Sequence, residues 1–217
     1  MNNNLTDINV VLDRSGSMER VKTDTIGGFN EFLRTQKEAQ GEANLTLAQF
    51  DDEYEIVYDG ISIKDVPELT GETFLPRGYT ALLDAIGCTI IATGARLAGL
   101  PEALRPANVI FVILTDGHEN QSTEFTLAKI NEMIQHQTDV YHWDFVFLGA
   151  NQDAILTGRN LGIKTGNSMA FATNEEGVTH VFTSVSMSML RYRMQPADTK
   201  TNFFLDEDRE NQKKSGA

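Results

Sequence analysis

Asp13, Ser15 and Ser17 alternate within a five-residue segment that follows the apolar run at 8–12. In one tight turn, a carboxylate and two hydroxyls at this spacing can converge on a single point as hard oxygen donors. A small hard cation such as Mg²⁺ prefers ligands of this kind. Three side chains cannot close a six-coordinate shell, so we expect other parts of the chain to add oxygens and one position to be left for a ligand.

Two further oxygen donors stand at the ends of predicted elements. Thr80 comes just before a helical pattern at 82–97, and Asp116 follows the continuous apolar run at 109–114. Such a run predicts a strand buried on both faces. If the strands that end at Asp13 and Asp116 are neighbours where the strand order reverses, both carboxylates open into one crevice.

Short apolar segments predict the strands that must position these residues. Two of them, 44–50 and 54–59, are joined only by Asp51-Asp52-Glu53, so we expect an antiparallel hairpin at a sheet edge with a solvated tip. The other predicted strands are 5–12, 109–114, 143–148 and a small edge strand at 168–172.

Amphipathic patterns alternate with these strands and predict helices. The predicted helices cover 19–40, 82–97, 125–137, a short segment to about 161, and a last helix from 173 to about 193. Thr173-Asn174-Glu175-Glu176 has the form of a capping box at the start of that last helix. In the first helix, Gly27 and Gly28 are expected to permit close packing on the sheet. The alternation predicts an α/β fold with a doubly wound, mostly parallel sheet, one antiparallel edge strand and helices on both faces.

We expect one domain over residues 1–194 and a polar, flexible tail over 195–217. The length of 217 residues and a hydrophobic content of 41% suffice for one large core. The tail is rich in charge and has no periodic apolar face. Phe203-Phe204-Leu205 could nevertheless dock onto the body or onto a partner.

The charge balance argues against some functions. The chain has 18 basic and 31 acidic residues and a net charge of −13, which repels a phosphate backbone and argues against nucleic-acid binding. The single cysteine, Cys88, cannot form an intrachain disulfide and is expected to be a core or packing residue. With no cationic apolar leader at residues 1–4, we expect a reducing, cytoplasmic setting. No apolar run approaches the roughly 20 residues that span a bilayer.

Other residues near the predicted site have simpler roles. Gly16, Gly78 and Gly117 are expected to allow turns with positive φ. Asp84, one turn inside its helix, is expected to interact with the helix dipole. His118 either lines the crevice or is a solvated loop histidine, and its polar neighbours favour the second role.

The dispersed oxygen donors resemble the three motifs of the von Willebrand factor type A domain with its metal-ion-dependent adhesion site (MIDAS). These motifs are Asp13-x-Ser15-x-Ser17, then Thr80, then Asp116 within a Thr-Asp-Gly sequence. The resemblance covers roughly residues 5 to 190. It implies a Rossmann-like fold in which Ser15, Ser17 and Thr80 contact Mg²⁺, or alternatively Mn²⁺ or Ca²⁺. Asp13 and Asp116 would act largely through water.

The resemblance also implies a function in protein–protein recognition. A partner's Asp or Glu would complete the metal shell, and the chain resembles the compact, stand-alone cytoplasmic forms of bacteria and phages. We therefore expect a non-enzymatic, divalent-cation-dependent protein-binding module without membrane insertion. The partner and the oligomeric state stay open.

Two alternative functions are compatible with the same residues. The first is a hydrolase with Ser15 or Ser17 as nucleophile and His118 as the nearest base, or a phosphotransferase that uses the same crevice. The second is an assembly protein that self-associates without metal dependence. Asn151-Gln152-Asp153, after the strand 143–148, either form a rim for partner recognition or serve only to cap the next helix.

Overall fold

A six-stranded sheet forms the centre of the protein in the computed structural model, which describes residues 1–150, 154–195 and 202–214. The strand order is β3-β2-β1-β4-β5-β6, and every neighbouring pair is parallel except β2 and β3. This confirms the predicted doubly wound sheet with an antiparallel edge strand. The strands are β1 (Asn2–Asp13), β2 (Glu42–Phe50), β3 (Tyr54–Ser62), β4 (Pro106–Thr115), β5 (Asp144–Ala150) and β6 (Ser168–Phe171).

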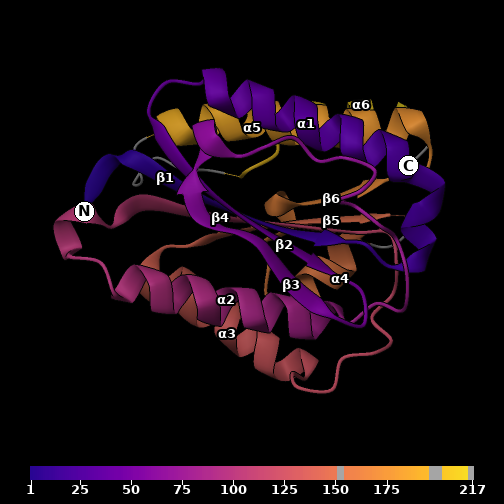
Figure 1. Cartoon of the computed structure of the whole chain (residues 1–217), viewed down its shortest axis with the longest axis horizontal. Helices are drawn as coiled ribbons and strands as arrows, with labels where there is room; N and C mark the ends of the chain where they lie inside the picture. The colour runs from indigo at the N-terminus through magenta and orange to yellow at the C-terminus, as the bar shows by residue number, and fades with distance from the viewer. Residues whose placement is uncertain (151–153, 196–201, 215–217) are drawn as a thin grey trace.

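Helices cover both faces of the sheet (Figure 1). One layer contains α1 (Lys22–Glu38), α5 (Glu175–Met194) and α6 (Asp206–Lys214), and the other contains α2 (Leu82–Ala98), α3 (Leu127–Tyr141) and α4 (Ala154–Asn160). Short 3₁₀ helices lie at η1 (Gly16–Val21), η2 (Ile63–Asp65), η3 (Glu102–Leu104) and η4 (Thr165–Asn167). Among the described residues, no helix has both the length and the apolar character needed to span a membrane.

The central strands are buried on both faces, as their unbroken apolar runs predict. In β1, Val10 and Leu12 belong to the core under α1 and α5, while Val11 belongs to the core against α2 and α3. In β4, Val112 belongs to the core under α1 and α5, and Phe111 belongs to the core against α2 and α3. Because both strands are sandwiched in this way, their carboxyl ends are held rigidly between two helical layers.

The order of the strands reverses at β1, which lies between β2 and β4 and is parallel to both. Leu12 pairs with Leu114 in β4, and Asp13 pairs with Phe50 in β2. The residues that follow β1 and β4 therefore meet at the carboxyl edge of the sheet, where ligands bind in doubly wound folds.

The C-terminal segment differs from the flexible tail expected after residue 194. Phe203 and Phe204 are fully buried, and α6 follows them. The backbone N–H of Phe203 donates to Asn167 Oδ1 at 2.9 Å, and the Phe203 ring lies 5.3 Å from that of Tyr192 in α5. Over 202–214 the expectation of flexibility is thus corrected: two adjacent phenylalanines supply the apolar anchor that a test for helical periodicity misses.

Two local predictions also need correction. Asn174 rather than Thr173 caps α5, because its side chain accepts the backbone N–H of Gly177 at 2.7 Å. Gly28 packs against α5 rather than the sheet, since a Cβ at this position would lie 2.3 Å from the ring of Phe182.

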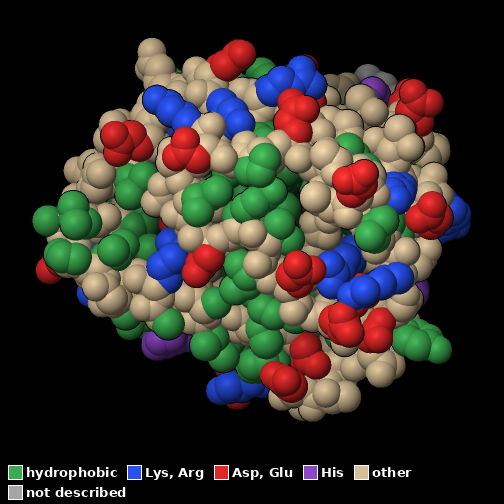
Figure 2. All heavy atoms as spheres, in the orientation of Figure 1, with side chains coloured by type: hydrophobic (Ala, Val, Ile, Leu, Met, Phe, Trp, Pro, Cys, Tyr) green, Lys and Arg blue, Asp and Glu red, His purple; other side chains and the backbone are tan. Residues whose placement is uncertain are grey.

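The surface carries charges of both signs. On the face shown in Figure 2, carboxylates and basic side chains are interspersed and apolar side chains are visible between them. The excess of acidic residues is therefore spread over this face and does not gather at one place.

Candidate metal centre

Asp13 anchors the turn after β1 to the end of β4. Its Oδ1 accepts the backbone N–H of Ser15 at 2.6 Å, and its Oδ2 accepts the hydroxyl of Thr115 at 2.5 Å. The residue is fully buried, and this burial raises the pKa of its carboxyl group from 3.8 to about 6. Since both carboxylate oxygens are already hydrogen-bonded, Asp13 can reach a bound cation most simply through a water molecule.

Ser15, Ser17 and Asp116 form the centre of the candidate site. The two serine Oγ atoms lie 3.2 Å apart, and Ser17 Oγ donates to Asp116 Oδ1 at 2.5 Å. Ligands on adjacent corners of an octahedron around Mg²⁺ lie about 3.0 Å apart, because each Mg–O distance is about 2.1 Å. The serine pair thus has the spacing of two direct ligands, whereas Asp116 lies closer to Ser17 than such an edge allows.

Thr80 reaches the site from the loop that precedes α2. Its backbone N–H donates to Asn120 Oδ1 at 3.0 Å, and its carbonyl oxygen accepts the N–H of Asn120 at 3.1 Å. The Thr80 hydroxyl lies beside Gly117, where a Cβ would come within 2.8 Å of Oγ1. The absence of a side chain at position 117 therefore allows the Thr80 hydroxyl to lie beside the residue that follows Asp116.

The tip of the β2–β3 hairpin holds the loop of Thr80 in place, contrary to the expected solvated turn. Asp51 is fully buried, and its Oδ2 accepts from Arg14 Nε at 3.0 Å and from Arg77 Nε at 2.8 Å. Its carbonyl oxygen accepts the N–H of Ala81 at 2.9 Å. The acidic tip is an ion-paired clamp that joins the turn after β1 to the loop before α2.

Glycine has a conformational role at only one of the three predicted positions. Gly78 has φ of 65°, whereas Gly16 and Gly117 do not have positive φ. A Cβ at Gly78 would also lie 1.7 Å from Asp52 Oδ1. The Gly78 carbonyl oxygen accepts the N–H of Gly16 at 3.2 Å, so this glycine fits the loop against the Asp-Ser-Ser turn.

Arg20 is a neighbour of the site that the sequence analysis missed. Its Nη2 lies 3.4 Å from Asp116 Oδ2, and its side chain is 64% exposed. A basic residue three positions after Ser17, at the start of the first helical segment, was the available signal. Its guanidinium places a positive charge at the mouth of a site that suits a cation.

Two carboxylates shape the loop between Asp116 and α3. Asp84 accepts the backbone N–H groups of Thr123, Glu124 and Phe125 at 2.8 to 3.0 Å, so it orders this loop instead of serving only the helix dipole. Glu119 accepts the N–H of Leu83 at 2.9 Å. The loop is thereby pinned to the first turn of α2.

The remaining candidates have different outcomes. His118 is exposed and lines a pocket beside the site. Cys88 is half-buried rather than a core residue, and burial raises the pKa of its thiol. Asn151, Gln152 and Asp153 lie outside the described residues.

Within 1–150, 154–195 and 202–214, no group of three or more His, Cys, Asp or Glu side chains could hold a metal, so a cation at this edge depends on hydroxyl ligands.

Solved structures share this arrangement of strands and helices. Proximal thread matrix protein 1 from the mussel byssus aligns with 82% of this chain and 46% of its own, at a TM-score of 0.56 and 14% identity. A von Willebrand factor type A protein from Catenulispora acidiphila aligns with 87% of this chain and 42% of its own, at a TM-score of 0.54 and 14% identity. The chain has the von Willebrand factor type A fold.

The similarity covers only part of each solved structure, and it is limited to the fold. The ArnB paralog VWA2 from Sulfolobus acidocaldarius aligns with 84% of this chain and 44% of its own, at a TM-score of 0.51 and 16% identity. This chain therefore aligns with less than half the length of each of these three proteins. No family model and no curated protein matches the sequence. One structure of the mussel protein has a zinc-occupied MIDAS motif.

Proposed function

We propose that this protein is a divalent-cation-dependent protein-binding module. The observation that carries the proposal is the convergence of Ser15, Ser17 and Asp116 at the strand-order reversal between β1 and β4. Ser17 and Asp116 are 99 positions apart in the sequence, yet their oxygen atoms are in hydrogen-bond contact. A zinc-occupied MIDAS in a protein with the same fold supports a metal at this place.

In this proposal Ser15, Ser17 and Thr80 contact the cation, and Asp13 and Asp116 hold water molecules around it. The serine spacing of 3.2 Å fits adjacent ligands of Mg²⁺, and the hydrogen-bonded state of Asp13 fits an indirect role. Mg²⁺ is the proposed ion because the donors are hard oxygens, and Mn²⁺ and Ca²⁺ share this preference. When bound, the cation supplies a Lewis-acidic position that attracts an anionic oxygen.

The proposed partner presents an Asp or Glu side chain to that position. Three hydroxyl ligands are neutral, two carboxylates balance the two positive charges of the ion, and the Arg20 guanidinium adds a positive charge at the mouth, so the site carries no net negative charge when the partner arrives. The weak charge donation of hydroxyls leaves the cation able to attract one more carboxylate. We propose that no chemical conversion follows, because the site residues serve to bind oxygen rather than to transfer protons.

The test compares Thr80→Ala with the wild type by calorimetric titration of MgCl₂, and by binding of peptides that contain a single Asp or Glu. We expect Thr80→Ala to lower Mg²⁺ affinity at least tenfold and to abolish peptide binding, as EDTA does for the wild type. Thr179→Ala, an exposed threonine on α5, is the control. Peptide binding that survives both EDTA and Thr80→Ala in folded protein would rule the proposal out, and ester or phosphate hydrolysis lost in Ser15→Ala would favour an enzyme.

A further inference from the structure

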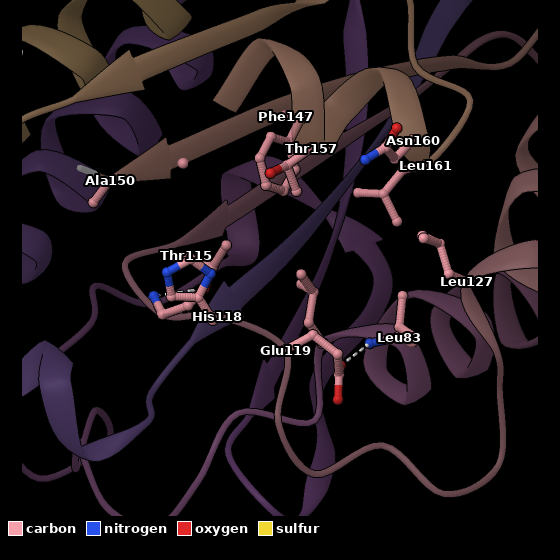
Figure 3. A pocket seen from close by; sticks show the side chains of 13 residues that line it. Leu83, Thr115, His118, Glu119, Leu127, Phe147, Ala150, Thr157, Asn160 and Leu161 are labelled. Carbon is pink, nitrogen blue, oxygen red and sulfur yellow. Dashed lines mark hydrogen bonds between the residues drawn. The ribbon is translucent and has the colours of Figure 1, made fainter. Parts of the chain in front are cut away.

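A pocket of about 220 Å³ lies beside the candidate metal centre (Figure 3). It opens at the carboxyl ends of β4 and β5, where the layer of α2, α3 and α4 meets the sheet edge. Thr115 and Gly117, which flank Asp116 in sequence, both line it. The pocket therefore borders the metal centre at the end of β4.

The lining of the pocket is largely apolar. Leu83, Phe147 and Leu161 form its inner walls, and Leu127 at the start of α3 lies at its edge with 44% of its surface exposed. None of these four leucine and phenylalanine side chains can donate or accept a hydrogen bond. They offer a ligand only apolar contact.

The polar side chains nearest to the metal centre are already engaged. The Thr115 hydroxyl donates to Asp13 and accepts the N–H of Gly117, and Glu119 accepts from the N–H groups of Leu83 and Ser122. A polar ligand group would have to compete with these bonds, whereas an apolar group would not. Between Thr115 and Leu83 the lining therefore favours an apolar occupant, while His118, Thr157 and Asn160 are the other polar residues of the lining.

The volume matches one side chain. About 220 Å³ holds roughly seven molecules of water at about 30 Å³ each, and sites for drug-sized ligands start at about 300 Å³. A single phenylalanine or leucine side chain fits within this volume. The pocket therefore suits one large apolar side chain better than a cofactor.

We propose that this pocket takes a large apolar side chain of the same partner whose carboxylate binds the metal, so that the two groups form a paired recognition motif. The inference rests on the proposed function. Neighbouring strands lie about 4.8 Å apart, and an extended peptide advances about 3.3 Å per residue. The apolar residue of the partner thus lies within one to three positions of its acidic residue.

The experiment uses nine-residue peptides with one central Asp in a Gly/Ser background. A Leu, a Phe or a Ser is placed one, two or three positions to either side, and affinity is measured by NMR titration in MgCl₂ and in EDTA. Burial of one such side chain corresponds to about a 10- to 100-fold gain in affinity. We expect that gain for Leu or Phe at one or two of these offsets, and only in MgCl₂.

Variants of the pocket separate this inference from the proposed function. Leu127→Gln removes the apolar edge and Thr157→Trp fills the pocket from α4, so both should abolish the preference for Leu or Phe over Ser. Mg²⁺ affinity should stay within twofold of the wild type, because neither residue belongs to the metal centre. Leu104→Gln, 57% exposed in η3 before β4, is the matched control.

The outcomes are distinct. Mg²⁺-dependent binding of all peptides without an apolar preference, or a preference that persists in both Leu127→Gln and Thr157→Trp, overturns the inference and leaves the proposed function intact. If no peptide binds in a Mg²⁺-dependent way, both are overturned. A melting curve for each variant verifies that it is folded.

Discussion

Ser17 donates a hydrogen bond to Asp116 across the junction of β1 and β4, with Ser17 Oγ and Asp116 Oδ1 2.5 Å apart. The two residues come from turns that follow neighbouring parallel strands, so the contact exists only because β1 and β4 are paired. In this state Ser17 uses its hydroxyl hydrogen to hold the carboxylate. In our proposal a cation contacts the lone pairs of Ser17 Oγ, and Asp116 reaches that cation through water.

Replacement of Ser17 by alanine is predicted to weaken Mg²⁺ binding without unfolding the protein. The change removes one proposed ligand and releases Asp116, while the half-exposed position of Ser17 leaves no buried cavity. We expect at least a tenfold loss of Mg²⁺ affinity by calorimetry and a change in melting temperature of only a few degrees in EDTA. Ser184→Ala on α5 is the control, and unchanged Mg²⁺ affinity in Ser17→Ala would remove Ser17 from the site.

Asp13→Asn is predicted to stabilise the metal-free protein at neutral pH. The folded-state pKa of about 6 lies above the unfolded value of 3.8, so the folded state binds the proton more tightly. Stability due to this group is present below about pH 4 and is lost as pH rises to about 6. At pH 7 the buried charge costs about 3 kcal/mol, because each pKa unit corresponds to about 1.4 kcal/mol.

Urea denaturation in EDTA measures this effect. The difference in unfolding free energy between Asp13→Asn and the wild type should grow from near zero at pH 4 to about 2 to 3 kcal/mol at pH 7. The exposed Asp65→Asn variant should show no such growth. An unfolding free-energy difference that does not change with pH would contradict the raised pKa of Asp13 and this prediction.

Asp51→Asn is predicted to destabilise the fold and to weaken Mg²⁺ binding, although Asp51 is no metal ligand in our proposal. The substitution removes the buried partner of Arg14, whose side chain is 9% exposed and which keeps only the more exposed Glu55. Loss of one member of a buried ion pair costs about 3 to 5 kcal/mol, and the remaining pair with Glu55 places the expected loss at or below the lower end of that range. Denaturation and Mg²⁺ titration check the two effects together.

The matched control for this clamp is Glu53→Gln. Glu53 contacts the same Arg77 but is 69% exposed, so its ion pair is worth less than about 1 kcal/mol. If Asp51→Asn lowers stability but leaves Mg²⁺ affinity unchanged, the clamp supports the fold alone and does not position Thr80.

Arg20→Gln is predicted to raise Mg²⁺ affinity a few-fold. The guanidinium lies 3.4 Å from Asp116 Oδ2 and repels an incoming cation, and water around its exposed side chain weakens this repulsion. The gain should shrink as NaCl is raised from 20 to about 500 mM, because salt screens exposed charges. Arg34→Gln, a similarly exposed arginine of α1, should have no effect. A fall in affinity would show that Arg20 assists the site.

Phe203→Ala is predicted to destabilise the protein by about 3 to 5 kcal/mol, the usual range for removal of a buried phenylalanine. Its ring packs against Tyr192 and Phe204, so the substitution would remove both ring contacts and leave a cavity in the core under α5. Leu205→Ala, 45% exposed, should cost under about 1 kcal/mol. Equal stability of the two variants in urea would restore the view of residues after 194 as a flexible tail.

Much of the framework was accessible from the chain itself. The apolar runs that end at Leu12 and Leu114 predicted buried parallel strands, and the structure confirms that they are neighbours. Their ends carry Asp13 and Asp116, so the position of the candidate site followed from the strand-end rule for doubly wound sheets. These predictions succeeded because hydrophobic periodicity and strand termination are recorded in consecutive residues.

The errors share a different cause. Asp51 lies in a short acidic turn, which is typical of a solvated hairpin tip, and its two arginine partners are 37 and 26 positions away. The residues around Gly28 indicate packing against the sheet, and none of them indicates its contact with Phe182. In both cases the deciding contact joins segments that are remote in sequence, and a local pattern contains no information on such a contact.

The sequence by itself determined the residue types of the site, the strands that carry them and the layered α/β class, since these depend on local composition and periodicity. Only the tertiary structure decided that Ser17 touches Asp116, that Arg20 lies beside that carboxylate and that Phe203 closes the core. Side-chain contacts of this kind are selected by the packing of the whole domain, because burial and ion pairing act over distances in space and not along the chain.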